Sequence, residues 1–159
     1  MVSDKEIIYL ERAKNELNLA ETIFKISTTK ELKLELGLKE DISFFSNVIG
    51  SCYFCIFYSA KALLEFKSIK TKQPNEHNKT LKEFEKLVES GEIDRKLLEI
   101  YHNLVIKADE LLGIFVIEKN KRGKYTYRRL PQSNLEPAKK SIRNAGIFLK
   151  NVNLLIKNE

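Results

Sequence analysis

Residues 42–66 read ISFFSNVIGSCYFCIFYSAKALLEF, and this stretch decides the fold. No charged residue occurs from Ile42 to Ala60, and apolar side chains occur on every side of a helix with this sequence. Such a helix lies at the centre of a protein or spans a membrane. Four serines and an asparagine interrupt the uncharged run, and amphipathic segments on both sides of it require an apolar partner. We therefore expect a core helix over about 39–67, with no membrane partner.

Residues 4–26 form the first of these amphipathic segments. Apolar side chains recur there at intervals of three and four residues, which predicts a helix with one apolar face. Ser3 or Asp4 stands at its start, where a side-chain oxygen can accept a hydrogen bond from an unpaired backbone N–H group. A short helical piece over 30–36 is expected to follow.

The segment after the central helix contains a break and two further helices. Pro74 lies inside residues 68–79, and this stretch is expected to be a loop. A short amphipathic helix is predicted over 80–90, ending at Gly91 because glycine readily adopts the left-handed conformation of a helix C-terminus. Another helix is predicted from about residue 93, with leucines at helical spacing.

The C-terminal part of the chain is predicted to end in a long helix. Ser133 or Asn134 is expected to cap it, and Pro137 is tolerated in a first turn. Residues 114–129 favour a small hairpin, with a frayed helix and a loop as the alternative. The whole pattern predicts an all-α fold, a four- to five-helix up-and-down bundle in a single domain over residues 1–159.

The composition of the chain indicates a cellular compartment and a class of binding partner. Its 159 residues carry a net charge of +6, and a basic surplus of this size favours polyanionic partners. The two cysteines, Cys52 and Cys55, lie inside the apolar run and are expected to be buried free thiols, which suits a reducing compartment. Residues 3–6 are too polar for the start of a secretory signal. We therefore expect a cytoplasmic protein.

Basic residues gather in a segment near the predicted hairpin. Cations beside rings that can stack on bases are what a single-stranded RNA or nucleotide surface requires; a solvated loop is the alternative. The segment contributes the following residues: Lys119, Lys121, Arg122, Lys124, Tyr125, Tyr127, Arg128 and Arg129. A second basic segment over 67–72 leads to His77, which we assign to the same binding function, with an ordinary surface histidine as the alternative.

His102 lies seven residues after Arg95 and seven before Asp109. Seven residues are about two helical turns, so the three side chains follow one line along a helix. A histidine could remove the proton of an RNA 2′-hydroxyl, and an arginine could stabilise the charge that develops on phosphorus. A boundary histidine with flanking charges is the alternative. No glycine-rich phosphate loop and no cysteine–histidine set with metal spacing occurs, so we expect no cofactor and no metal site.

The stretch 51–64, SCYFCIFYSAKALL, is followed by EFKSI and then by His77. This pattern resembles the HEPN domain family, in the small stand-alone branch found in bacteria and archaea. The family's first helix resembles residues 9–14, and its last helix resembles residues 145–148. The resemblance covers most of the chain, but its motifs are mainly packing motifs, so it indicates fold more than activity.

The resemblance implies a helical bundle that commonly forms homodimers and binds RNA or nucleotides. It often implies a neighbouring minimal nucleotidyltransferase, the two proteins acting as toxin and antitoxin. Active family members are metal-independent endoribonucleases that use an arginine, four to six further residues and a histidine. Arg95 and His102, with six residues between them, fit this pattern and are the candidate catalytic pair.

The chain departs from the family pattern at two places. Lys96 follows the arginine where a small polar residue is usual, and Lys107 precedes Ala108–Asp109 where the branch often has arginine. A non-enzymatic, dimeric helical interaction module therefore stays open as the alternative function.

Overall fold

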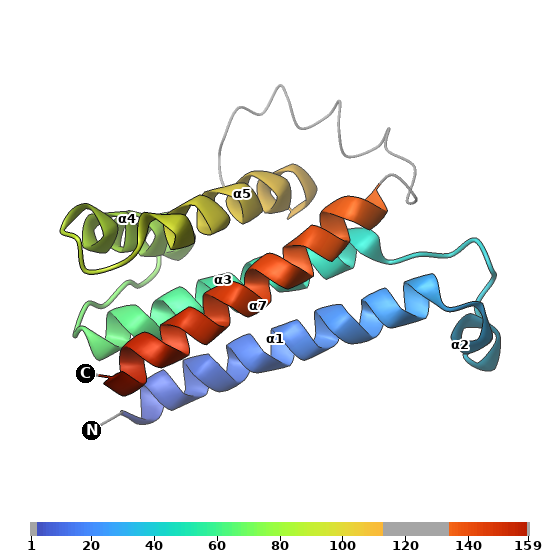
Figure 1. The fold of residues 1–159 in the computed structure, drawn as a ribbon, viewed down its shortest axis with the longest axis horizontal. Coiled ribbons are helices and arrows are strands. Elements are labelled where there is room, and N and C mark those ends of the chain that lie inside the picture. Colours follow the sequence, from blue (N-terminus) through green and yellow to red (C-terminus); the bar gives the residue numbers. More distant parts are fainter. Residues whose placement is uncertain (1–2, 113–133, 159) are drawn as a thin grey trace.

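The computed structural model describes residues 3–112 and 134–158, and every element in these ranges is a helix (Figure 1). The prediction of an all-α fold is therefore confirmed for the described chain. The helices are α1 (Asp4–Thr28), α2 (Lys30–Glu35), α3 (Phe45–Phe66), α4 (Glu76–Glu89), α5 (Arg95–Leu112) and α7 (Leu135–Asn158). The hairpin or loop predicted near 114–129 lies outside the described residues.

The apolar helix α3 lies at the centre of the molecule. Helices α1 and α7 run beside it, and α4 and α5 cover the side away from α1 (Figure 1). In the described chain, α3 is the one helix long and apolar enough to cross a membrane, and 78% of its most apolar window is buried by the other helices. Its apolar surface therefore has protein partners, as expected for a core helix.

Small side chains let the neighbouring helices approach α3 closely. Ala13 and Ala20 of α1 and Ala138 and Ala145 of α7 have no exposed surface. Each pair is seven residues apart, which places both alanines on one face of the helix. At these four positions no side chain extends beyond Cβ, so the helices can approach their neighbours closely there.

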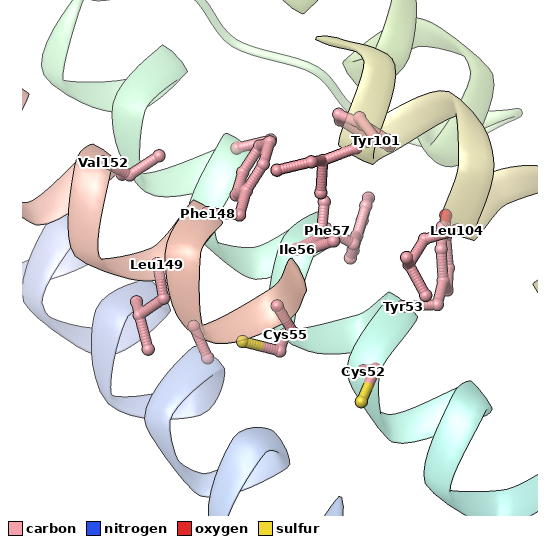
Figure 2. Close-up of a cluster of buried hydrophobic side chains, with 14 of the residues drawn as sticks. Cys52, Tyr53, Cys55, Ile56, Phe57, Tyr101, Leu104, Phe148, Leu149 and Val152 are labelled. Atoms are coloured by element: carbon pink, nitrogen blue, oxygen red, sulfur yellow. The ribbon is translucent and has the colours of Figure 1, made fainter. Parts of the chain in front are cut away.

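Aromatic side chains fill the space between α3, α5 and α7 (Figure 2). The rings of Phe84, Tyr101 and Phe148 contact one another, with centroids 5.3 to 5.8 Å apart. All three side chains are fully buried. Aromatic pairs at such distances add to the stabilisation that burial alone provides. This cluster therefore joins α4, α5 and α7 in one core.

Two helix ends are as predicted from the sequence: the start of α1 and the end of α4. The Ser3 hydroxyl accepts a hydrogen bond from the Glu6 backbone N–H, and the Glu6 carboxylate accepts one from the Ser3 N–H at 2.9 Å. This reciprocal pair is a capping box, so Ser3 is the cap. Gly91 has a φ of +81° just after α4, as predicted for a helix terminus.

Two predicted helix starts were wrong. The central helix begins at Phe45, because the Ser27 hydroxyl accepts a hydrogen bond from the Phe44 N–H at 2.8 Å and holds the preceding segment outside the helix. Helix α4 begins at Glu76, four residues before the predicted start. His77 therefore lies in a first helical turn and not in a loop.

Replacing Phe148 with alanine tests the aromatic core. The change removes a fully buried ring, and we expect it to lower the free energy of unfolding by about 3–5 kcal/mol. Urea denaturation followed by circular dichroism measures the loss. The matched control is Leu34→Ala on α2, where the side chain is 62% exposed and a change within about 0.5 kcal/mol is expected. Equal losses in both variants would contradict the packing described.

Candidate functional site

Arg95 and His102 lie beside the same surface depression between α4 and α5. Arg95 is the first residue of α5 and His102 follows two turns later. The depression is lined by these two residues together with Glu85, Val88, Glu89 and Leu98. Asp109, the third residue of the predicted line, is buried and does not belong to this lining.

His102 is held by a carboxylate from the neighbouring helix. Its Nε2 lies 2.8 Å from Oε1 of Glu85, with side chains that are 45% and 34% exposed. A carboxylate that accepts the Nε2–H proton favours the tautomer in which Nδ1 carries a lone pair. In the described part of the chain, Nδ1 of His102 makes no hydrogen bond. This nitrogen can therefore accept a proton from a bound substrate.

The electrostatics of the depression are mixed. Arg95 supplies a permanent positive charge, whereas Glu85 and Glu89 supply two carboxylates. This lining alone is a poor attractor for a polyanion, since the carboxylates offset the arginine. Binding of RNA here therefore requires positive charge from elsewhere on the protein.

The strongest basic segment of the sequence lies outside the described residues. The predicted RNA-binding residues in it are Lys119, Lys121, Arg122, Lys124, Tyr125, Tyr127, Arg128 and Arg129. This segment joins α5 to α7 in the chain. Its binding role stays a prediction.

His77 packs among aromatic side chains, away from the Arg95 depression. Its Nδ1 lies 2.6 Å from the hydroxyl of the fully buried Tyr53, and its ring stacks on Phe57 with centroids 4.2 Å apart. Burial lowers the pKa of His77, the nearby Lys61 lowers it further, and Glu76 opposes the shift. These contacts give His77 a structural role at the start of α4, and its predicted nucleotide contact stays a prediction.

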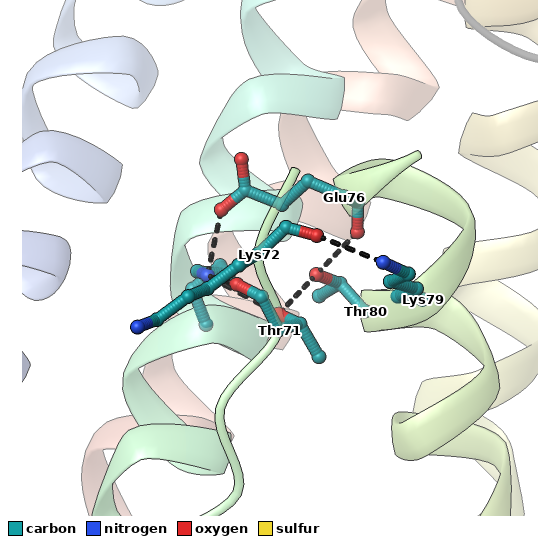
Figure 3. Close-up of polar contacts among 6 residues, drawn as sticks. Thr71, Lys72, Glu76, Lys79 and Thr80 are labelled. Atoms are coloured by element: carbon teal, nitrogen blue, oxygen red, sulfur yellow. Dashed lines mark hydrogen bonds and ion pairs between the residues drawn. The ribbon is translucent and has the colours of Figure 1, made fainter. Parts of the chain in front are cut away.

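Lys61 is a buried charge that the sequence analysis did not single out. Its Nζ donates to the Thr71 carbonyl at 2.6 Å and to the Thr71 hydroxyl at 3.1 Å, and it lies 2.7 Å from the Glu76 carboxylate. Thr71 in turn hydrogen bonds to Thr80 at 2.8 Å (Figure 3). The signal in the sequence is a single lysine inside the apolar run SAKALL, because a buried charge requires a partner.

The thiols do not form a reactive site. Cys52 and Cys55 are free and buried, and burial raises the pKa of both, that of Cys55 to about 12. A thiol with such a pKa stays protonated at neutral pH and is a poor nucleophile and a poor metal ligand. Within residues 3–112 and 134–158, no group of three or more metal-ligating side chains occurs.

The low pKa of His77 predicts a pH-dependent stability. When pH falls below the ordinary histidine pKa of about 6.5, the unfolded chain takes up a proton that folded His77 resists, so stability present above that pH is lost. We expect urea midpoints of the wild type to fall between pH 7.5 and the lowered pKa, and His77→Gln to reduce this fall. The control, Leu34→Ala on α2, keeps the His77 contacts and removes no titratable group, so it should retain the wild-type dependence. Identical pH profiles for His77→Gln and the wild type would contradict the assignment.

No protein-family model matches the chain, and no curated protein is significantly similar to it. The contacts of Arg95, His102 and Glu85, together with the resemblance described above, therefore carry the functional argument.

Proposed function

We propose that the chain is a HEPN-like domain that binds single-stranded RNA or nucleotides. In this proposal Arg95 and His102 are the catalytic residues, and the domain cleaves RNA without a metal ion. The observation that carries the proposal is the shared depression, in which Arg95 and His102 lie together and Glu85 holds the imidazole. The resemblance of residues 51–69 to the HEPN family supports the same function. A nuclease in the reducing interior of a cell also agrees with the two free thiols.

The chemistry follows from the two side chains. Nδ1 of His102 accepts the proton of a ribose 2′-hydroxyl, and the 2′-oxygen attacks the adjacent phosphorus. The bond from phosphorus to the 5′-oxygen breaks, which leaves a 2′,3′-cyclic phosphate and, after protonation, a 5′-hydroxyl end. Arg95 neutralises the charge that develops on the phosphoryl oxygens. Glu85 stabilises the imidazolium that forms when His102 is protonated.

The proposal includes partners that the resemblance implies. A homodimer would place two Arg95–His102 pairs in one assembly. The His102 imidazolium of one copy could then protonate the 5′-oxygen that leaves the RNA bound at the other copy. A minimal nucleotidyltransferase would be the antitoxin of this toxin-like chain. Co-expression of both proteins, followed by affinity purification of the complex, tests this second partnership.

Substitution of His102 tests the cleavage. We expect His102→Gln to slow cleavage of end-labelled single-stranded RNA by about 10²-fold or more, and Arg95→Gln to have an effect of similar size. The products should carry 2′,3′-cyclic phosphate ends. The control is Lys96→Gln, an exposed cation on the same helical turn, which should cleave within about threefold of the wild type. Equal cleavage by the wild type and His102→Gln would remove the assignment.

A non-enzymatic dimeric module is the second candidate function. It is favoured by apolar side chains on the outer face of α7, where Ile147 is 41% exposed and Leu154 is 47% exposed. They lie seven residues apart and therefore on one line of the helix. A face of this kind can pack against a second copy or a partner helix.

Two measurements separate the candidate functions. The module predicts that Ile147→Lys together with Leu154→Lys converts a dimer to a monomer in sedimentation experiments. It also predicts no retention of RNA or nucleotide in filter binding at low salt. The nuclease predicts RNA retention that weakens as salt rises, because phosphate contacts release counterions. Retention of RNA by the wild type would reject the module as the whole function.

A further inference from the structure

A second depression lies at the opposite end of α4 from the Arg95 depression. Three segments form it: the first turns of α1, the end of α3 and the chain that follows α3. It has a volume of about 250 Å³ and is lined by Lys5, Ile8, Tyr9, Arg12, Lys61, Glu65, Lys70, Thr71 and Lys72. We call it the α1–α3 pocket.

The α1–α3 pocket is strongly basic. Lys5, Arg12, Lys70 and Lys72 contribute four cations to the lining, and Glu65 is the one carboxylate in it. In the chain that the structure describes, none of these four cations lies within ion-pair distance of a carboxylate. Their charge is therefore available to an anion that enters the pocket.

The buried Lys61 holds the backbone from which two of these cations, Lys70 and Lys72, extend. It does not supply the free charge itself, because its Nζ is paired with Glu76. Its bonds to Thr71 hold the chain after α3 against the core, and Thr80 anchors the same threonine to α4 (Figure 3). Thr71 is buried, whereas Lys70 and Lys72 on either side of it are exposed. The anchored threonine therefore presents both lysines on the surface.

Aromatic rings position the α1 side of the pocket. The ring of Tyr9 stacks on Tyr58 with centroids 6.4 Å apart, and Lys61 Nζ lies 5.2 Å from the Tyr9 centroid. The guanidinium of Arg12 lies 5.6 Å from the centroid of Tyr58. A cation over an aromatic face is attracted by the ring quadrupole, which restricts its motion. Arg12 is therefore pre-oriented before any ligand binds.

We propose that the α1–α3 pocket binds one phosphate group of the RNA ligand. The proposal rests on the nucleic-acid binding proposed above. Available cations converging from two segments, α1 and the chain after α3, suit a phosphate, and the volume is below the range of pockets that enclose a whole drug-sized ligand. The phosphate can be a terminal group or an internal diester. Nine residues of helix, or about 14 Å, separate Glu76 from Glu85 along α4, so the pocket provides positive charge at a distance from the mixed Arg95 depression.

Charge removal at the pocket provides the test. The variant carries Lys70→Gln and Lys72→Gln, and the matched control carries Lys139→Gln and Lys150→Gln, two exposed lysines of α7. Fluorescence anisotropy measures binding of single-stranded RNA across a salt series, with His102→Gln in every protein to prevent cleavage. We expect at least about tenfold weaker binding than the control. The slope of log K against log salt should fall by about 0.7, the value for one lost phosphate contact on a single strand.

Two further arms identify the phosphate. The first arm compares a 5′-phosphorylated RNA with its 5′-hydroxyl counterpart. If the phosphorylated RNA binds more tightly, and does so only when Lys70 and Lys72 are present, the pocket binds a terminal phosphate. Equal binding of the two RNAs, with the loss retained in the pocket variant, assigns an internal diester. Equal affinity of pocket variant and control overturns the pocket and leaves the proposed RNA binding intact.

Inorganic pyrophosphate separates failure of the pocket from failure of the proposed function. Its binding is followed by the amide chemical shifts of residues 70–72. If the wild type binds no RNA but pyrophosphate shifts these amides, the RNA function fails and the pocket is an anion site for another ligand, so the proposal as stated is overturned. If neither RNA nor pyrophosphate binds, both proposals are overturned.

Discussion

The structure depends on one constraint, the need of α3 to be covered on all sides. A helix without charge for most of its length cannot leave a wide face in water, so its neighbours must supply apolar surface around its whole circumference. Helices α1 and α7 meet this need on one side, and α4 and α5 meet it on the other (Figure 1). The positions of the candidate functional residues follow from this arrangement, because Arg95, His102 and the α1–α3 pocket all lie on the covering helices or at the exit of α3.

The sequence predicted the long helices well because their signals are local. The uncharged run predicted α3, and apolar spacing predicted α1 and α5. The start of α4 was missed because its first turn depends on distant contacts, among them the bond between the Tyr53 hydroxyl and His77. For the candidate site, spacing placed Arg95 and His102 in one line. Glu85 could not be found in this way, because it contacts His102 from another helix, seventeen positions away in the chain.

Charge is divided unevenly over the two ends of α4. Near its start, the ion pair of the buried Lys61 with the partly exposed Glu76 organises a chain segment that presents Lys70 and Lys72 to solvent. Near its end, Glu85 and Glu89 reduce the positive potential around Arg95. In a polyanion-binding protein, such a division separates the task of attracting the ligand from the task of transferring protons.

The alanines that face α3 have a consequence for how the bundle is specified. Leucine and isoleucine contacts stabilise many relative positions of two helices, since apolar attraction is not directional. The two alanine pairs, each repeating after seven residues, allow close approach in few of these positions. A slide of α1 by one turn would bring Leu17 toward the place of an alanine, and the same slide of α7 would bring Leu149 there. The four alanines therefore determine the axial register of the helices by steric fit, which the larger apolar residues cannot do.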